Sequence, residues 1–403
     1  MSITAAPPAD STTVVRGFIP ALEGLRGLAA LGVLVTHVAF QTGATNITVL
    51  GRALGRFDLA VALFFALSGF LLWRSHAAAA RGLAKPQTMV RYWISRATRI
   101  LPAYWVAVVL VLAFLPEADS SFTTWWANLA LVQVFVPYTL TGGLTQMWSL
   151  SVEVAFYLVL PLLAWALVQL RGDRARWRIP VITGSAVLCL LWAFLPVPAL
   201  DGTHHDNWLP GYLPWFAAGM LLAELAVVPP TFVHKMARHR WWMLAAAIAV
   251  FALTATDLAG PEGLVRPEPW QYAVKIALGA IMSFLLMAPL VLADAGTAAG
   301  HRLLASPPAL AIGRWSYAIF IWHLPILTII FPVFGLMPFA GNFRYVLLLT
   351  VVLSIAVASA SYALVEEPSR RAVKRWQARR TALDRDSGIT ASPVATKATA
   401  IGS

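Results

Sequence analysis

Two ionisable residues interrupt a long apolar segment near the start of the chain. Arg26 and His37 are eleven positions apart within residues 19–40. Eleven residues are close to three turns of an α-helix, so we expect both side chains on one face, about 16 Å apart along the axis. Ionisable groups in an apolar membrane helix are costly unless they are partnered or functional. His37 is therefore a candidate general base, the alternative being a buried histidine that a neighbouring group satisfies.

A carboxylate is expected at a depth similar to that of His37. Glu153 lies near the start of another apolar segment, 147–170, one to two turns below its outer end. A carboxylate beside a histidine can orient the ring and stabilise its charged form, as a general base requires. We therefore expect Glu153 to orient His37. The alternative is a structural ion pair between Glu153 and an arginine.

Two arginines are expected at the opposite, inner end of a third segment. Arg96 and Arg99 are three residues apart, which places both on one helix face. Paired guanidinium groups suit the phosphate groups of a ligand. The alternative is ordinary anchoring, since Lys and Arg gather on the cytoplasmic side of membrane proteins.

Three further polar residues occur in the last two apolar segments. Tyr317 and His323 lie in 312–331, with His323 near the middle of the membrane. His323 is either a second site histidine or a satisfied core residue, and we favour the core residue. Glu366 ends the last segment at about the depth of Arg26. It either pairs with Arg26 or only caps the helix end.

These residues need helices to position them, and the sequence predicts ten membrane-crossing segments. Each has about the length that an α-helix needs to cross a bilayer. A shorter stretch, 122–137, is bounded by Pro116 and Pro137, and we expect it to be re-entrant or interfacial. The ten segments are 19–40, 58–79, 95–115, 147–170, 180–197, 208–228, 240–258, 270–293, 312–331 and 345–366.

Composition supports an all-α polytopic membrane protein. Of the 403 residues, 59% are hydrophobic and only 12% are charged, whereas a soluble domain has about 25% charged residues. These values exclude a soluble enzyme and a disordered protein. A single cysteine, Cys189, excludes an intrachain disulfide.

The basic residues follow membrane topology. The net charge of +12 is concentrated in 74–99, 171–178, 234–240 and the segment after 366, while the intervening loops carry the acidic residues. This alternation predicts ten crossings with both termini cytoplasmic and no nucleic-acid partner. We expect a disordered N-terminus at 1–16, a transmembrane domain at 17–370 and a basic, disordered cytoplasmic tail at 371–403.

The ordered set of motifs resembles the acyltransferase-3 family of membrane acyltransferases. Arg26 and His37 look like its first-helix Arg-x10-His motif, and Arg96-x-x-Arg99 looks like its cytoplasmic arginine motif. The similarity extends over about residues 18–370, with Glu23 where the family more often has Asp. The other similar stretches are Phe64–Phe70, Trp148–Glu153 and Ser316–His323.

The resemblance implies a membrane-bound O-acyltransferase of the bacterial plasma membrane. Such an enzyme takes an acyl group from cytoplasmic acyl-CoA, here acetyl-CoA as co-substrate, and transfers it to an envelope hydroxyl. It needs no bound cofactor and no metal. His37 and Glu153 are then catalytic, and Arg96 and Arg99 bind acyl-CoA. The oxyanion of the reaction needs a donor, for which Tyr317, Ser151 and Arg26 are the candidates.

Other short stretches resemble a branch of the family that acetylates trehalose monomycolate. They are 18–20, 37–43 and 140–146. The acceptor implied is the mycolate 3-hydroxyl of this glycolipid, which would enter from the membrane. Alternatives are another envelope glycan or a macrolide-like metabolite, and a covalent acyl-His37 relay in place of direct transfer. A lipid transporter or flippase is the alternative from another class. No sequence feature identifies a protein partner.

Overall fold

The computed structural model describes residues 17–46, 49–84, 88–263, 265–293 and 301–386. These residues are helical and contain no β-strand, as the sequence predicts. The expected disordered N-terminus, 1–16, lies outside the described residues, as do positions 387–403 of the expected tail.

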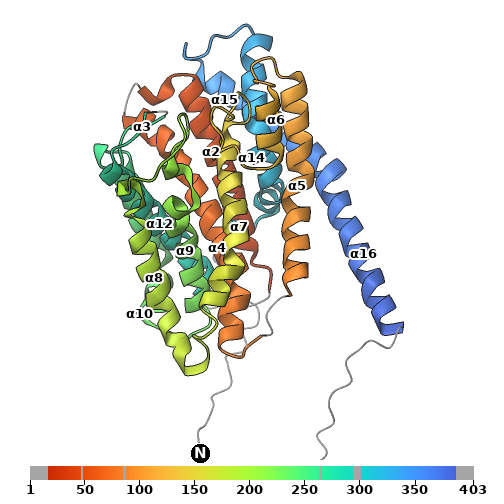
Figure 1. Ribbon diagram of the computed structural model, residues 1–403. Helices are drawn as coiled ribbons and strands as arrows, with labels where there is room; N and C mark the ends of the chain where they lie inside the picture. Colours follow the sequence, from red (N-terminus) through yellow and green to blue (C-terminus); the bar gives the residue numbers. More distant parts are fainter. Residues whose placement is uncertain (1–16, 47–48, 85–87, 264, 294–300, 387–403) are drawn as a thin grey trace, which may run out of the picture.

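The long helices form an upright bundle (Figure 1). Two short helices lie near the end where the first long helix stops, and a third lies toward the other end. The bundle helices are α2 (Pro20–Gln41), α4 (Ala60–Ala80), α5 (Met89–Phe114), α7 (Trp148–Ala166), α8 (Arg178–Cys189), α9 (Leu209–Leu225), α11 (Arg240–Thr254), α12 (Pro269–Val291), α14 (Pro307–Val333) and α15 (Phe343–Ser361). The shorter ones include α3 (Val49–Gly55), α6 (Phe122–Leu129) and α10 (Phe232–Ala237).

Each of the ten predicted segments overlaps one bundle helix. Within the described residues, eight spans are long and apolar enough to cross a membrane. The helices α9 and α11, with 17 and 15 residues, are shorter than these spans. The stretch 122–137 is no spanning helix, because α6 has only 8 residues and is followed by turns. The chain is therefore a multi-span membrane protein.

Two helix pairs approach closely because glycines lie at their contacts. A Cβ atom on Gly313 of α14 would lie 2.1 Å from the backbone oxygen of Glu23 in α2. On Gly219 of α9 it would lie 1.8 Å from the backbone oxygen of Ala66 in α4. Small residues let membrane helices pack backbone to backbone. These two contacts fix α2 against α14 and α4 against α9, and so hold the polar residues of α2, α4 and α14 at set positions.

The end of the last span differs from the sequence prediction. A π-helical turn, Tyr362–Glu366, follows α15 and leads into α16 (Glu367–Asp386). The predicted disordered tail from 371 is therefore helical as far as 386, which corrects the expectation. The prediction is wrong there because a polar, basic helix shows little apolar periodicity. Figure 1 shows α16 diverging from the bundle.

Candidate active site

A cavity lies among α2, α4, α5, α7 and α14. The space among their side chains amounts to about 580 Å³ when the part open to solvent is included. Its walls combine charged or hydroxyl-bearing residues with a larger set of apolar side chains. The polar lining is Arg26, Ser68, Arg99, Ser149, Glu153, Tyr157 and Tyr317; the apolar lining includes Phe64, Phe65, Leu71, Ile100 and Phe320.

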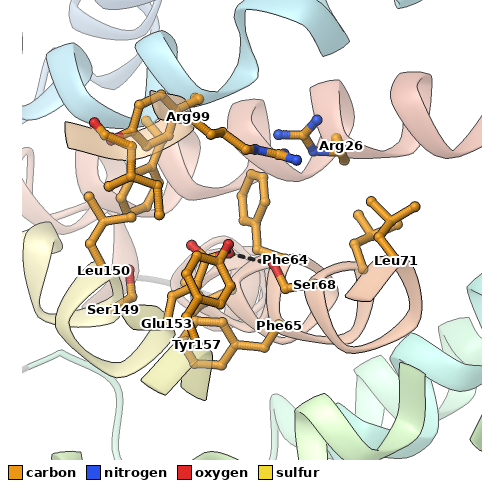
Figure 2. A pocket seen from close by; sticks show the side chains of 15 residues that line it. Arg26, Phe64, Phe65, Ser68, Leu71, Arg99, Ser149, Leu150, Glu153 and Tyr157 are labelled. Atoms are coloured by element: carbon orange, nitrogen blue, oxygen red, sulfur yellow. Dashed lines mark hydrogen bonds between the residues drawn. The ribbon is translucent and has the colours of Figure 1, made fainter. Parts of the chain in front are cut away.

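Glu153 is held on one side of the cavity by two hydroxyl groups. The Ser68 hydroxyl donates to its Oε1 at 2.5 Å, and the Tyr157 hydroxyl donates to the same oxygen at 2.6 Å (Figure 2). Tyr157 lies one helical turn after Glu153 on α7, so the helix brings these two together. The carboxylate therefore has a fixed orientation at the cavity wall.

Two guanidinium groups lie on the other side of the cavity. Figure 2 shows the side chains of Arg26 and Arg99 extending toward each other across from Glu153. Arg26 Nη1 is 3.4 Å from a carboxylate oxygen of Glu23. Arg99 forms no hydrogen bond or ion pair with any described residue. Two neighbouring cations, one with unused donors, are suited to an anionic or strongly polar ligand.

Of the two α5 arginines that the sequence analysis pairs, only Arg99 lines the cavity. Arg96 is not part of the cavity lining; its guanidinium carbon lies 5.7 Å from the ring centre of Tyr157. Its Nη2 donates to Ser95 Oγ at 3.0 Å. Arg96 thus supports the wall from behind, and the cavity pairs Arg99 with Arg26 of another helix.

The three candidate oxyanion donors differ in their access to the cavity. The Tyr317 hydroxyl lines the cavity but donates to the backbone oxygen of Ile100 at 2.8 Å. Ser151 is buried outside the cavity lining, and its hydroxyl has no partner among the described residues. Arg26 is the candidate whose charged end faces the cavity.

His37 contacts a second histidine. His323 Nε2 lies 3.2 Å from His37 Nδ1, and the ring centres are 5.0 Å apart. His37 Nδ1 is also 2.8 Å from the backbone oxygen of Val33, and His323 Nδ1 is 3.1 Å from that of Ile319. Each ring thus faces the carbonyl four residues earlier on its own helix, and we call His37 and His323 the histidine pair.

The expected contact between His37 and Glu153 is not formed. Glu153 bonds to Ser68 and Tyr157, whereas His37 bonds to Val33 and His323. The cause is the depth at which α7 begins.

The side chain of Gln146, just before α7, donates to the backbone oxygen of Ile321 in the middle of α14. The start of α7 is therefore already level with a residue two positions before His323. Glu153, about 10 Å further along the helix axis, lies at a deeper level than the histidine pair.

Glu366 lies in the π-helical turn and is only 2% exposed. Neither of its carboxylate oxygens has a hydrogen-bond partner among the described residues. A hydrogen bond to Arg26, one of the two alternatives for this residue, is not formed, and Arg26 contacts Glu23 of its own helix. A π-helical turn often marks a functional position.

Sequence reasoning missed two polar residues of the cavity. In the sequence Ser68 is only one position of the similar stretch Phe64–Phe70, and Tyr157 does not stand out. The spacing of Tyr157 from Glu153, four residues on one helix, is nevertheless a usable signal. For Ser68 no signal exists, because its partner is on a different helix. The neighbouring Gly69 does permit close packing, since a Cβ there would lie 2.1 Å from the backbone oxygen of Phe216.

Comparison with known proteins gives one family. Residues 19–363 match the family model Acyl_transf_3, described as an acyltransferase domain. Peptidoglycan O-acetyltransferase OatA of Listeria monocytogenes is 25% identical over 387 residues, which cover 90% of this chain and 57% of the relative.

Two further relatives show similar levels of identity. Acyltransferase MdmB of Streptomyces mycarofaciens is 28% identical over 77% of this chain and 79% of its own. O-acetyltransferase OatA of Staphylococcus aureus is 25% identical over 88% of this chain and 57% of its own. The chain thus spans little more than half the length of the OatA proteins. No solved structure gives a significant match.

Proposed function

Because this chain belongs to the acyltransferase-3 family of membrane acyltransferases, we propose that it transfers an acetyl group from acetyl-CoA to a hydroxyl group of a cell-envelope molecule. The observation that carries this proposal is the arrangement of a cationic cavity below a histidine pair on shared helices. A CoA thioester is an anionic molecule with a long, mostly uncharged arm, and the cavity offers two guanidinium groups and apolar walls for it.

In the proposed complex, Arg26 and Arg99 bind the negatively charged end of the donor. Arg96 completes the basic surface behind Tyr157. Arg26 and His37 are about 16 Å apart along α2, a distance that the pantetheine arm of CoA can roughly cover. Glu153 offers its second carboxylate oxygen to an amide of that arm. The donor then approaches from the side of Arg26, which we assign to the cytoplasm from the basic loops at that end.

His37 is the general base of the proposed reaction. If Nδ1 carries the proton and donates to the Val33 carbonyl, Nε2 holds the free lone pair. His323 supports this tautomer, since its own Nδ1 faces a carbonyl and its Nε2 is free to accept from His37. The ring is therefore oriented by a carbonyl oxygen and an imidazole nitrogen.

The reaction follows from this orientation. Nε2 of His37 removes the proton of the acceptor hydroxyl, and the hydroxyl oxygen attacks the thioester carbonyl carbon. The carbon–sulfur bond breaks, and the CoA thiolate takes up the proton from the imidazolium. A variant in which His37 itself carries the acetyl group uses the same ring.

The acceptor that we propose is trehalose monomycolate, through its mycolate 3-hydroxyl. The support is the resemblance of segments 18–20, 37–43 and 140–146 to the acetyltransferase of this glycolipid. Peptidoglycan is the second candidate, because the name of the Listeria relative assigns that acceptor to the relative.

The test is acetyl transfer by the purified protein in lipid. Labelled acetyl-CoA is supplied with trehalose monomycolate or with peptidoglycan fragments, and His37→Ala is compared with wild type. We expect labelled glycolipid from wild type and a loss of about a hundred-fold or more in His37→Ala. The control is His204→Ala, which changes an exposed loop histidine.

Other outcomes separate the alternatives. Labelled peptidoglycan without labelled glycolipid would show that the acceptor is peptidoglycan, and the proposed acetyltransferase activity would stand. Full transfer by His37→Ala would remove His37 as base. If wild-type protein consumes no acyl-CoA of any chain length, the transporter or flippase becomes the better assignment.

A further inference from the structure

Two phenylalanine rings line the cavity, and one of them lies next to the histidine pair. Phe64 of α4 and Phe320 of α14 both line it, and their ring centres are 6.0 Å apart in an edge-to-face arrangement. Phe320 is 6% exposed, and Phe64 is partly buried and packs against both hydrophobic clusters of the bundle. We call these two residues the aromatic pair.

Within α14, Phe320 of the aromatic pair lies between Tyr317 and His323. Tyr317, Phe320 and His323 are spaced three residues apart on α14, so each lies about 4.5 Å further along the helix than the one before. Tyr317 and Phe320 line the cavity, whereas His323 does not. The ring centres of Phe320 and His323 are 5.9 Å apart.

We propose that Phe64 and Phe320 set the acyl-chain length of the donor and restrict it to short chains such as acetyl. This inference rests on the proposed function, since it specifies the donor of that reaction.

The space beside the histidine pair limits the length of the acyl chain that the site can hold. In the proposed complex the arm of a donor held at Arg26 and Arg99 extends toward the histidine pair, and the acyl group at its end lies against the two rings. Protein interiors are close-packed, and extra methylene groups forced into them displace side chains at a cost. Each methylene beyond acetyl must therefore displace an aromatic ring.

A neighbouring ring, Phe65, is a poorer candidate. It lines the cavity too, but it stacks on Phe216 at 4.4 Å and contacts Trp215 and Tyr212. Its position is fixed by the core between α4 and α9, and replacing it would disturb that packing. Phe64 and Phe320 pack against each other and both line the cavity, so their truncation enlarges the cavity beside them.

The experiment measures donor selectivity as a ratio. Release of free CoA from acetyl-CoA and from hexanoyl-CoA is followed in lipid with trehalose monomycolate present, for wild type, Phe64→Ala and Phe320→Ala. A ratio of kcat/KM values is unaffected when part of a variant fails to fold. We expect wild type to prefer acetyl-CoA and both variants to lower that preference about ten-fold or more.

A matched control separates selectivity from stability. Phe156 is fully buried, stacks on Phe216 at 4.0 Å and is not part of the cavity lining. Phe156→Ala should lower the amount of folded protein and leave the donor ratio unchanged. Phe64→Leu, a milder change at the pair itself, should shift the ratio in the same direction as Phe64→Ala by a smaller factor.

The proposal is overturned if active Phe64→Ala and Phe320→Ala keep the wild-type ratio, or if wild type uses hexanoyl-CoA as well as acetyl-CoA. Either result leaves the acyltransferase function intact. If wild type releases no CoA from either donor, with trehalose monomycolate or with peptidoglycan fragments as acceptor, the proposed function fails and this proposal fails with it.

Discussion

His323 Nε2 lies 3.2 Å from His37 Nδ1, and this contact joins α2 to α14 at the level of the proposed reaction. His323 is fully buried, so its imidazole cannot turn freely away from the contact. A base is commonly oriented by a carboxylate, and the sequence assigns that function to Glu153. Here the backbone oxygen of Val33 and the imidazole of His323 occupy those positions.

Replacing His323 should therefore impair catalysis more than binding. In His323→Leu the ring of His37 loses one of its two acceptors and keeps only the Val33 carbonyl, and we expect kcat to fall about ten-fold to a hundred-fold with little change in the KM for acetyl-CoA. His323→Gln supplies an amide oxygen as acceptor and should recover part of the rate. Equal loss of kcat in both variants, at unchanged folded content by size-exclusion chromatography, would contradict the orienting function.

Arg99 should act on donor binding. Because its guanidinium group has no partner among the described residues and faces the cavity, Arg99→Ala should raise the KM for acetyl-CoA about ten-fold or more. Arg99→Lys keeps the charge without the planar donor set and should recover only part of the loss.

The control is Arg314→Ala, since Arg314 is an exposed arginine of α14. Its KM for acetyl-CoA should match that of wild type. A wild-type KM in Arg99→Ala would instead mean that other residues bind the negatively charged end of acetyl-CoA.

The helices were predictable because each has to be apolar over most of its length. Apolar runs of this length can be recognised directly in the sequence, and all ten segments are found as helices. The polar residues His37, Arg26, Arg99 and Glu153 were identified for the same reason, since a charged or imidazole group in an apolar run stands out.

Their pairing was not predictable, because it depends on the relative heights of different helices. Gln146 binds the backbone oxygen of Ile321 and so brings the start of α7 below the histidine pair. Nothing in the sequence of α7 reports this depth. The same holds for Ser68, whose partner Glu153 is 85 positions away.

The close contact of α4 with α9 should be sensitive to a single methyl group. In Gly219→Ala the new Cβ would lie 1.8 Å from the backbone oxygen of Ala66, and backbone cannot yield as a flexible side chain does. We expect a clear fall in melting temperature, measured by the loss of soluble, monodisperse protein on heating in detergent. Overpacking of this kind costs about 1–3 kcal/mol or more.

Gly184→Ala is the matched control, because Gly184 is also helical but a methyl group added there would have nothing within 4 Å. It should leave the melting temperature unchanged or slightly higher, since alanine favours a helix over glycine. Equal destabilisation of both variants would mean that helix propensity, and not the contact with Ala66, decides the outcome.

Glu153 offers the sharpest distinction between the sequence-based mechanism and the structural one. If Glu153 oriented His37, Glu153→Gln would lower kcat and alter its dependence on pH, because the base would lose its charged partner. In the structure Glu153 bonds to Ser68 and Tyr157 and faces Arg26 and Arg99 across the cavity (Figure 2).

We therefore expect Glu153→Gln to raise the KM for acetyl-CoA and to leave the pH profile of kcat as in wild type. Ser68→Ala, which removes one of the two hydroxyls on Glu153, should raise KM in the same direction by a smaller factor. The measurement is kcat and KM over a pH series for the three proteins. A displaced pH profile in Glu153→Gln would support Glu153 as the residue that orients His37. The two side chains would then have to come into contact during the reaction.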